Sequence, residues 1–172
     1  FTHIPGLKVA VPSNPYDAKG LLHAAIDDPD PVLLLEHMKL YRSIRQEVPA
    51  ERYTVPLGQA AVVQPGRDVS VFAYGAMVGV AIEAARQAAE SSGASVEVID
   101  LRTIAPLDEA AIAASVNKTG RAVVVHEAPR SGGVAAEVIA IINELCLYSL
   151  LAPVERVTGP DAAFPVPRLE DA

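Results

Sequence analysis

Several residues capable of polar chemistry stand together in residues 96–112, which read VEVIDLRTIAPLDEAAI. Asp100 and Arg102 come where an apolar run ends, and Asp108 comes where a helix is expected to begin. These three residues can form a local set of ion pairs and caps, because an acid near a helix start interacts favourably with the helix dipole. Alternatively, Arg102 and Thr103 reach a ligand or another protein.

His126 and Glu127 follow the apolar run RAVVV and suggest acid–base or metal chemistry. A metal site needs further ligands, and His3, His23 and His37 lie in a different predicted domain. General acid–base catalysis needs a reacting partner, and no nucleophile with an obvious base accompanies His126. We therefore expect His126 to lie at a strand end, bonded to a carboxylate or a carbonyl.

Two glycine motifs allow a binding or a purely structural interpretation. Gly132 and Gly133 precede a predicted helix, where free N–H groups can receive an anion. The same pair also lets the chain turn sharply. Gly75 and Gly79 do not form the G-x-G-x-x-G pattern, and no Lys-Ser or Lys-Thr follows them, so we predict no nucleotide site there.

The elements that position these residues alternate regularly after residue 68. Strands are expected at 69–74, 95–100, 121–127 and 153–159, and helices at 76–92, 107–117 and 134–150. Gly93 and Gly120 follow two of these helices, as C-terminal capping glycines do. This order predicts an α/β fold with a doubly wound, mainly parallel sheet, in which functional groups gather at the carboxyl ends of the strands.

The first part of the chain predicts a separate βαβ unit. Residues 7–11 and 32–36 read as parallel strands, the second of them of the buried type. The helix between them is expected to begin at Pro15, with Asn14 as its N-cap. Residues 37–65 contain three prolines after Glu36 and read as a linker with short strands. We predict one domain over residues 1–52 and a second over residues 53–172.

Composition limits the classes of function. The chain has 172 residues, 51% of them hydrophobic, and a net charge of −7, which argues against nucleic acid as the main partner. Cys146 is the single cysteine and is expected to be a buried, inert thiol. No apolar segment is long enough to span a membrane, no signal peptide is evident, and both ends read as cuts through a longer protein.

The order of several motifs gives a specific resemblance. The segments PGLKVAVPSNPYDAKGLL, LLLEHMKLYR, GRDVSVFAYGAMV, VEVIDLRTIAPLD and KTGRAVVVHEAPRSGGVAAEV occur in this order. The chain resembles the beta subunit of the thiamine-diphosphate-dependent decarboxylating component of 2-oxo acid dehydrogenase complexes. This resemblance implies a transketolase-type C-terminal domain preceded by the end of a pyrimidine-binding domain.

The resemblance also implies an assembly and a reaction. Such beta subunits pair with alpha subunits as α2β2 and bind thiamine diphosphate with magnesium at the α/β interface. The enzyme decarboxylates a 2-oxo acid and passes the acyl group to a lipoyl acyltransferase, whose subunit-binding domain docks on the complex. The family's catalytic Glu and His-Ser-Gln motif do not occur here, so we assign no catalytic or cofactor-binding residue and expect this chain alone to be inactive.

Two further sites are implied by the resemblance. Backbone carbonyls at Ala25, Asp28 and Asp30 match a monovalent cation site that usually holds potassium, although Pro29 alters the pattern and a plain helix-ending turn is an equal alternative. Asp100, Arg102, His126 and Glu127 are expected at the interface with a neighbouring subunit. Arg102 is expected to order its own loop first.

Several alternatives stay open. The sequence His-Glu-Ala-Pro followed by Gly-Gly favours branched-chain members over pyruvate or acetoin members. Other interpretations are the C-terminal part of a 1-deoxyxylulose-5-phosphate synthase or transketolase, and a non-catalytic docking module for the acyltransferase. The resemblance implies a cytoplasmic location in a bacterium or the mitochondrial matrix in a eukaryote.

Overall fold

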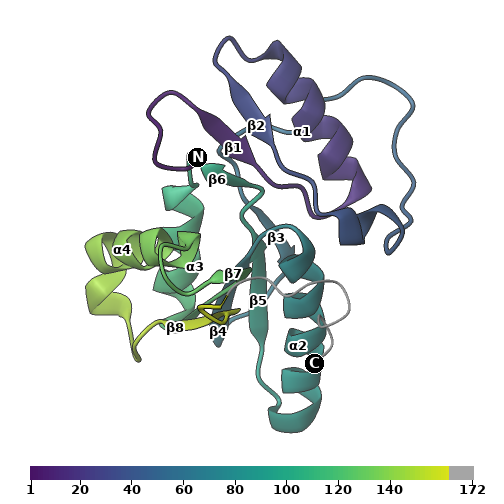
Figure 1. Ribbon diagram of the computed structural model, residues 1–172. Helices are drawn as coiled ribbons and strands as arrows, with labels where there is room; N and C mark the ends of the chain where they lie inside the picture. Colours follow the sequence, from purple (N-terminus) through teal and green to yellow (C-terminus); the bar gives the residue numbers. More distant parts are fainter. Residues whose placement is uncertain (163–172) are drawn as a thin grey trace.

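The computed structural model describes residues 1–162 and contains two sheets (Figure 1). One sheet has three strands in the order β2-β1-β6, and the other has five strands in the order β3-β5-β4-β7-β8. The end of the predicted second domain, residues 163–172, lies outside the described residues. Within residues 1–162, no helix is both long and apolar enough to cross a bilayer.

The smaller sheet contains the predicted βαβ unit. Strand β1 (Lys8–Ala10) pairs in parallel with β2 (Val32–Leu34), and α1 (Pro15–Asp27) connects them. The Asn14 side chain caps α1 by accepting the Asp17 N–H at 2.9 Å, so the predicted helix start is confirmed. Strand β2 is only half-buried, in contrast to the buried strand that we expected, because it forms the edge of its sheet.

A strand that the sequence did not predict completes the smaller sheet. Strand β6 (Thr103–Ala105) pairs antiparallel with β1, although it lies beyond the predicted domain boundary. The segment after β2 forms the short helix η1 (Met38–Tyr41) and then β3 (Ala61–Gln64). The smaller sheet is therefore built from both sides of the predicted boundary, and the boundary itself stays a prediction.

The larger sheet follows the predicted alternation. Its elements are β4 (Val69–Ala73), α2 (Ala76–Ser92), β5 (Val96–Asp100), α3 (Glu109–Thr119), β7 (Ala122–Pro129), α4 (Val134–Cys146), η2 (Leu147–Ser149) and β8 (Glu155–Gly159). Strands β5, β4, β7 and β8 are parallel, and β3 pairs antiparallel with β5 at the edge. The mainly parallel sheet is confirmed.

Helices cover both faces of the larger sheet. Helix α2 packs small side chains such as Ala81 and Ala85 against Val98, whereas α3 and α4 pack Val116 and Ile142 on the opposite face. The sheet is therefore doubly wound, as predicted. Its order places β4 between β5 and β7. The connection from β4 runs to β5 on one side and the connection from β5 crosses to β7 on the other, which creates a switch point between the carboxyl ends of β4 and β7.

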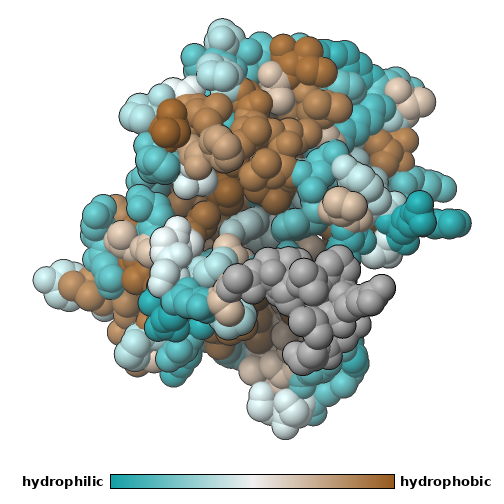
Figure 2. All heavy atoms as spheres, viewed as in Figure 1, coloured by the Kyte–Doolittle hydropathy of each residue, from teal (hydrophilic) through white to brown (hydrophobic). Residues whose placement is uncertain are grey.

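The molecule also exposes an apolar surface. Figure 2 shows apolar side chains gathered over the three-stranded sheet, and the exposed apolar residues of this half include Phe1, Ile4 and Leu35. Cys146 is buried as predicted, and its helix ends there, four residues earlier than the expected end at 150. Burial raises the pKa of the Cys146 thiol, which is consistent with an inert side chain.

Candidate functional site

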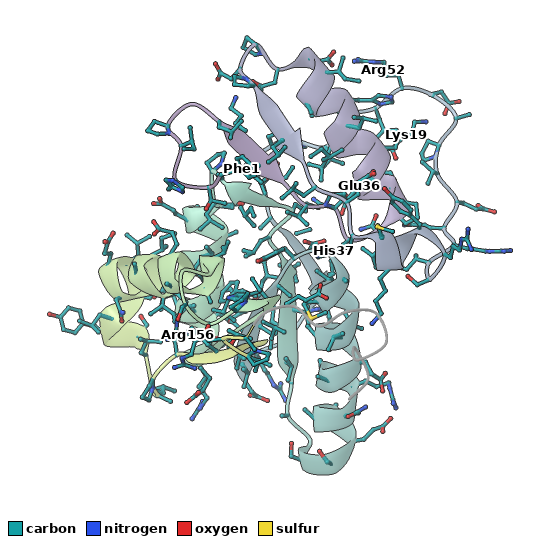
Figure 3. All side chains as sticks on the ribbon, viewed as in Figure 1. Phe1, Lys19, Glu36, His37, Arg52 and Arg156 are labelled. Atoms are coloured by element: carbon teal, nitrogen blue, oxygen red, sulfur yellow. The ribbon has the colours of Figure 1, made fainter. Side chains whose placement is uncertain are left out.

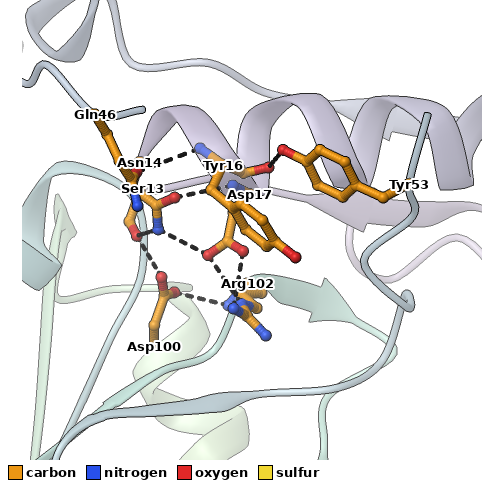
Figure 4. A network of polar contacts seen from close by, with 8 residues as sticks. All are labelled: Ser13, Asn14, Tyr16, Asp17, Gln46, Tyr53, Asp100 and Arg102. Carbon is orange, nitrogen blue, oxygen red and sulfur yellow. Dashed lines mark hydrogen bonds and ion pairs between the residues drawn. The ribbon is translucent and has the colours of Figure 1, made fainter. Parts of the chain in front are cut away.

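The polar residues at the end of β5 join the two sheets through a buried network (Figure 4). Asp100 is fully buried, and its carboxylate accepts hydrogen bonds from the Ser13 hydroxyl and, at 2.9 Å, from the Arg102 N–H. Ser13 belongs to the loop between β1 and α1, so this contact spans 87 residues of sequence. Asp100 therefore connects β5 of the larger sheet with the loop before α1, so that it joins the two halves of the molecule, the smaller and the larger sheet with their helices.

Arg102 pairs with Asp17 and not with the nearby Asp108. Its Nη2 lies 2.8 Å from Asp17 Oδ1, and its Nε donates to Asp17 Oδ2 at 2.9 Å. Asp108 instead caps α3 by accepting the Ala111 N–H at 2.9 Å, and it also accepts the Ala60 N–H. The predicted cap by Asp108 is thus confirmed, whereas the predicted local ion pair is wrong: Arg102 orders its loop by reaching across to Asp17 of α1.

The backbone of Arg102 is unusual. It has φ +56°, in the left-handed region, where a residue with a Cβ is disfavoured by roughly 1–2 kcal/mol. The conformation turns the chain between β5 and β6 so that the Arg102 N–H faces Asp100 and the guanidinium faces Asp17. These contacts offset the backbone cost.

Charge in this network is unbalanced. Asp17 and Asp100 are both buried, and Arg102 is the cation of the labelled network (Figure 4). Burial raises the pKa of Asp100 to about 6, and the negative charge of Asp17 adds to this effect, while the Ser13 and Arg102 hydrogen bonds oppose it. Asp100 therefore keeps its proton to a higher pH than an exposed aspartate does.

Thr103 contributes to the same junction through its hydroxyl. The side chain is buried and its Oγ1 accepts the Gly58 N–H at 3.0 Å. The residue also begins β6, which pairs with β1. Thr103 therefore connects the segment around Gly58 to the smaller sheet, and these contacts explain its burial without a ligand.

His126 lies in β7 three residues before its end at Pro129, so it is not at the end of the strand as predicted. It is 2% exposed, and its Nδ1 is 3.0 Å from the Ala128 carbonyl oxygen, which confirms the expected bond to a carbonyl. Burial lowers the pKa of the imidazole, and Arg156 adds to this effect. The ring of Tyr74 stacks on it with a centroid distance of 6.3 Å.

Glu127 lies close to His37, a residue of the other predicted domain. His37, which is labelled in Figure 3, has its Nε2 3.6 Å from Glu127 Oε2, and its Nδ1 accepts the Ala76 N–H at 2.8 Å. His37 therefore caps the start of α2, where Gly75 offers no side chain to do so. A Cβ at Gly75 would collide with the imidazole. The missing capping residue before α2 is the signal that sequence reasoning overlooked.

The predicted cation site lies at the end of α1. Pro29 has no N–H, so the carbonyl of Ala25 cannot make the i+4 bond of a helix and is suited to a cation. The carboxylate of Asp28 binds the Lys8 ammonium at 2.7 Å, and Asp30 Oδ2 lies 3.2 Å from the same ammonium. Lys8 thus already supplies a positive charge to both carboxylates, and potassium binding stays a prediction.

The four residues expected at a subunit interface differ in exposure. Asp100 and His126 are buried within this chain, Arg102 is mostly buried, and Glu127 is exposed. Their contact with a neighbouring subunit stays a prediction. Residues 1–162 bring no three His, Cys, Asp or Glu side chains together as a metal site, so the residues described offer no such set to magnesium.

Known proteins match nearly all of the chain. Residues 58–172 match the family described as transketolase, C-terminal domain, and residues 1–43 match the transketolase pyrimidine-binding domain. The pyruvate dehydrogenase E1 component subunit beta of Bacillus subtilis is 57% identical over 166 residues, which cover 96% of this chain and 51% of that protein. The protein of the same name from Staphylococcus aureus is 54% identical over 167 residues, with coverages of 97% and 51%.

A solved structure agrees with this match. A split-gene transketolase, described as an inactive beta4 tetramer, has 27% identity and a TM-score of 0.78 over 94% of this chain and 51% of its own. The chain thus spans about half the length of the relatives that it matches. The relatives are named for pyruvate, so the expected preference for the branched-chain type is not supported. By its match over residues 58–172, the chain belongs to the transketolase C-terminal domain family.

Proposed function

We propose that this chain is part of the beta subunit of a pyruvate dehydrogenase E1 component. The observation that carries the proposal is the 57% identity to a protein of that name along 96% of the chain. The enzyme that the resemblance implies uses thiamine diphosphate and an alpha subunit to decarboxylate a 2-oxo acid, and it passes the acyl group to a lipoyl acyltransferase.

Within that enzyme, the role of the 172 residues of this chain is structural. Arg102 and Asp17, together with Asp100 and Ser13, hold the smaller sheet against the larger one from buried positions. The catalytic Glu and the His-Ser-Gln motif that the family uses do not occur among these 172 residues. The chain therefore supplies the frame of a shared active site and a surface for the alpha subunit, a second beta subunit and the acyltransferase.

The test is an assay of the full-length beta subunit produced together with its alpha subunit. With thiamine diphosphate and magnesium, we expect decarboxylation of pyruvate with a kcat/KM roughly tenfold or more above that of 3-methyl-2-oxobutanoate, since a pocket distinguishes small apolar groups by about this factor. The 172-residue chain alone should give no turnover.

Two outcomes would contradict the proposal. A preference for the branched-chain substrate would restore the branched-chain interpretation. Ketol transfer between sugar phosphates would place the protein with transketolases, whose split-gene member shares the fold at 27% identity. The difference between 57% and 27% identity favours the dehydrogenase.

A further inference from the structure

The chain between β2 and β3 exposes several large side chains. Met38 and Tyr41 of η1 are 82% and 63% exposed, and Arg42 and Arg45 are exposed as well. Methionine, arginine and the aromatic residues are the types enriched where proteins bind one another. The composition of residues 38–45 is therefore typical of a binding surface.

Both ends of this segment are held by hydrogen bonds. Before it, His37 accepts the Ala76 N–H and so caps α2. After it, the side-chain oxygen of Gln46 accepts the Tyr16 N–H of α1 at 3.4 Å. A surface that is already held in place loses less conformational entropy when a partner binds. Residues 38–45 are therefore positioned for binding before a partner arrives.

A mainly apolar cavity of about 200 Å³ lies between this segment and the start of α1. Its polar lining residues, Asn14, Glu36 and His37, each already have a hydrogen-bond partner. The volume is below the roughly 300–1,000 Å³ of sites for drug-sized ligands, so the cavity suits a single apolar side chain. Its apolar lining residues are Leu40, Tyr41, Ile44, Pro12, Pro15 and Ala18.

Three cations accompany the apolar lining. Lys39, Arg42 and Arg45 each adjoin one of the lining residues in the sequence, and we call these three residues the cationic rim. Lys39 and Arg42 are three residues apart at η1, and side chains at this spacing in a 3₁₀-helix lie on the same side. Residues 37–46 contain no acid. Within the part of the chain that the structure describes, the rim forms no ion pair.

We propose that the cavity and the cationic rim dock an acidic segment of a partner protein, which inserts one side chain of the size of leucine or phenylalanine and places its carboxylates beside the rim. The inserted side chain supplies most of the affinity, because anchors buried in pockets dominate protein interfaces. The rim attracts the acids and speeds the encounter. The net charge of −7 disfavours a nucleic acid as the occupant.

The experiment uses a displayed library of random peptides of about twelve residues, selected on the 172-residue chain. We expect the selected peptides to share one large apolar residue flanked by aspartates or glutamates. The tightest binder is then synthesised, and its association and dissociation rates are measured at low and at high salt. Salt screens the rim, so association should slow about tenfold or more at high salt, while dissociation changes less.

One pair of variants tests the cavity. Ala18→Met fills it from α1 with a residue that favours helix, so the peptide should dissociate about tenfold faster. Ala84→Met makes the same change at an exposed position of α2 and should alter neither rate.

A second pair tests the cationic rim. The double variant Arg42→Glu, Arg45→Glu reverses two of its charges, so association should slow about tenfold or more and lose most of its salt dependence. The double variant Arg67→Glu, Arg121→Glu changes the net charge equally at other exposed positions, and its effect should be much smaller.

A selection that yields no binder, or binders without acids, would overturn the proposal, and it needs no variant. Rates that are unchanged in Ala18→Met, or in the reversed rim, would also overturn it, provided that circular dichroism shows each variant to be folded. Self-association of the unmodified chain that Ala18→Met abolishes in ultracentrifugation would replace the partner by a second copy. None of these outcomes affects the proposed dehydrogenase role, which is assayed with the alpha subunit.

Discussion

Glu97 and Asp100 project from the same strand, β5, and both are buried, with exposed fractions of 2% and 0%. Glu97 accepts the Ser115 hydroxyl at 2.6 Å and pairs with the Lys118 ammonium, and both of these partners belong to α3. Asp100 accepts only neutral donors, the Ser13 hydroxyl and the Arg102 N–H. The guanidinium of Arg102 goes to Asp17 instead.

The two carboxylates consequently titrate in opposite directions. Burial alone would raise the pKa of Glu97, but Lys118 and Ser115 outweigh it, so the pKa falls below its usual value. Burial raises the pKa of Asp100 to about 6, and Asp17 adds to the effect. A buried acid that has its own cation is a stable part of one sheet, whereas the junction between the sheets shares one cation between two acids.

The largest expected effect comes from removing that shared cation. Arg102→Ala leaves Asp17 and Asp100 buried without a countercharge, while the backbone remains in the same unfavourable region. We expect a loss of about 3 kcal/mol in the free energy of unfolding, and a melting temperature lower by roughly 10 °C. Urea unfolding and calorimetry measure these changes.

Arg102→Lys is the control for this prediction. Lysine keeps the charge but cannot donate from two nitrogens in the planar geometry that Asp17 receives, so we expect an intermediate loss. If Arg102→Ala unfolded at the same urea concentration as the unmodified chain, the buried network would not hold the two sheets together.

The second effect is a dependence of stability on pH. The pKa of Asp100 is higher in the folded chain, about 6, than its ordinary value of 3.8, so the folded state holds the proton more tightly. The contribution of Asp100 to stability is therefore full below pH 4 and is lost as the pH rises through 6. A shift of about two pKa units corresponds to roughly 3 kcal/mol as an upper limit.

Asp100→Asn isolates this dependence. The amide does not titrate, so the difference in unfolding free energy between the variant and the unmodified chain should change by up to roughly 3 kcal/mol between pH 4 and pH 7, in favour of the variant at pH 7. Glu97 acts in the opposite sense. Its pKa is lowered in the folded chain, so its contribution to stability is present at pH values above its ordinary pKa of 4.5 and is lost in acid. That contribution is common to both chains and cancels. A difference that is constant with pH would contradict the raised pKa.

A smaller effect is expected where the acid has its own cation. Lys118→Met leaves Glu97 buried beside Ser115, but the Lys118 side chain is 46% exposed and water can partly replace it. We therefore expect a loss of about 2 kcal/mol at pH 7, below the range for a fully buried pair. The loss should shrink in acid as Glu97 becomes protonated.

The double variant Glu97→Gln, Lys118→Met tests the origin of that loss. If the uncompensated charge of Glu97 is the cause, the double variant should recover most of the stability, because the amide oxygen of the introduced glutamine can still accept the Ser115 hydroxyl. A double variant as unstable as Lys118→Met would show that packing of the lysine stem, and not charge, is responsible.

The difference between the larger sheet with its own helices and the junction between the two sheets also explains what the sequence could predict. Helix α2 has the predicted bounds of 76–92, because Gly93 ends it and an alanine-rich stripe marks its buried face. These are local signals. The pair of Arg102 with Asp17 joins residues 85 apart, and nothing in the periodicity of either segment indicates the other.

Strand β6 was missed for a related reason. It has three residues, too few for an alternating pattern, and its pairing with β1 is a tertiary contact. His37 is similar: it lies 39 residues before the N–H that it caps. The one local signal was the glycine before α2, which cannot cap a helix with a side chain and so required a cap from elsewhere.

The smallest expected effect concerns this cap, which joins the two halves from a more exposed position than Arg102. His37→Ala removes the acceptor of the Ala76 N–H, and we expect a loss of about 1 kcal/mol and faster hydrogen exchange at Ala76. Glu127→Gln removes only the 3.6 Å pair between partly exposed side chains, and it should cost less than about 0.5 kcal/mol. If Glu127→Gln were as damaging as His37→Ala, the ion pair would be the principal contact. The exposed contact between the halves would then depend on charge, as the buried contact of Arg102 does.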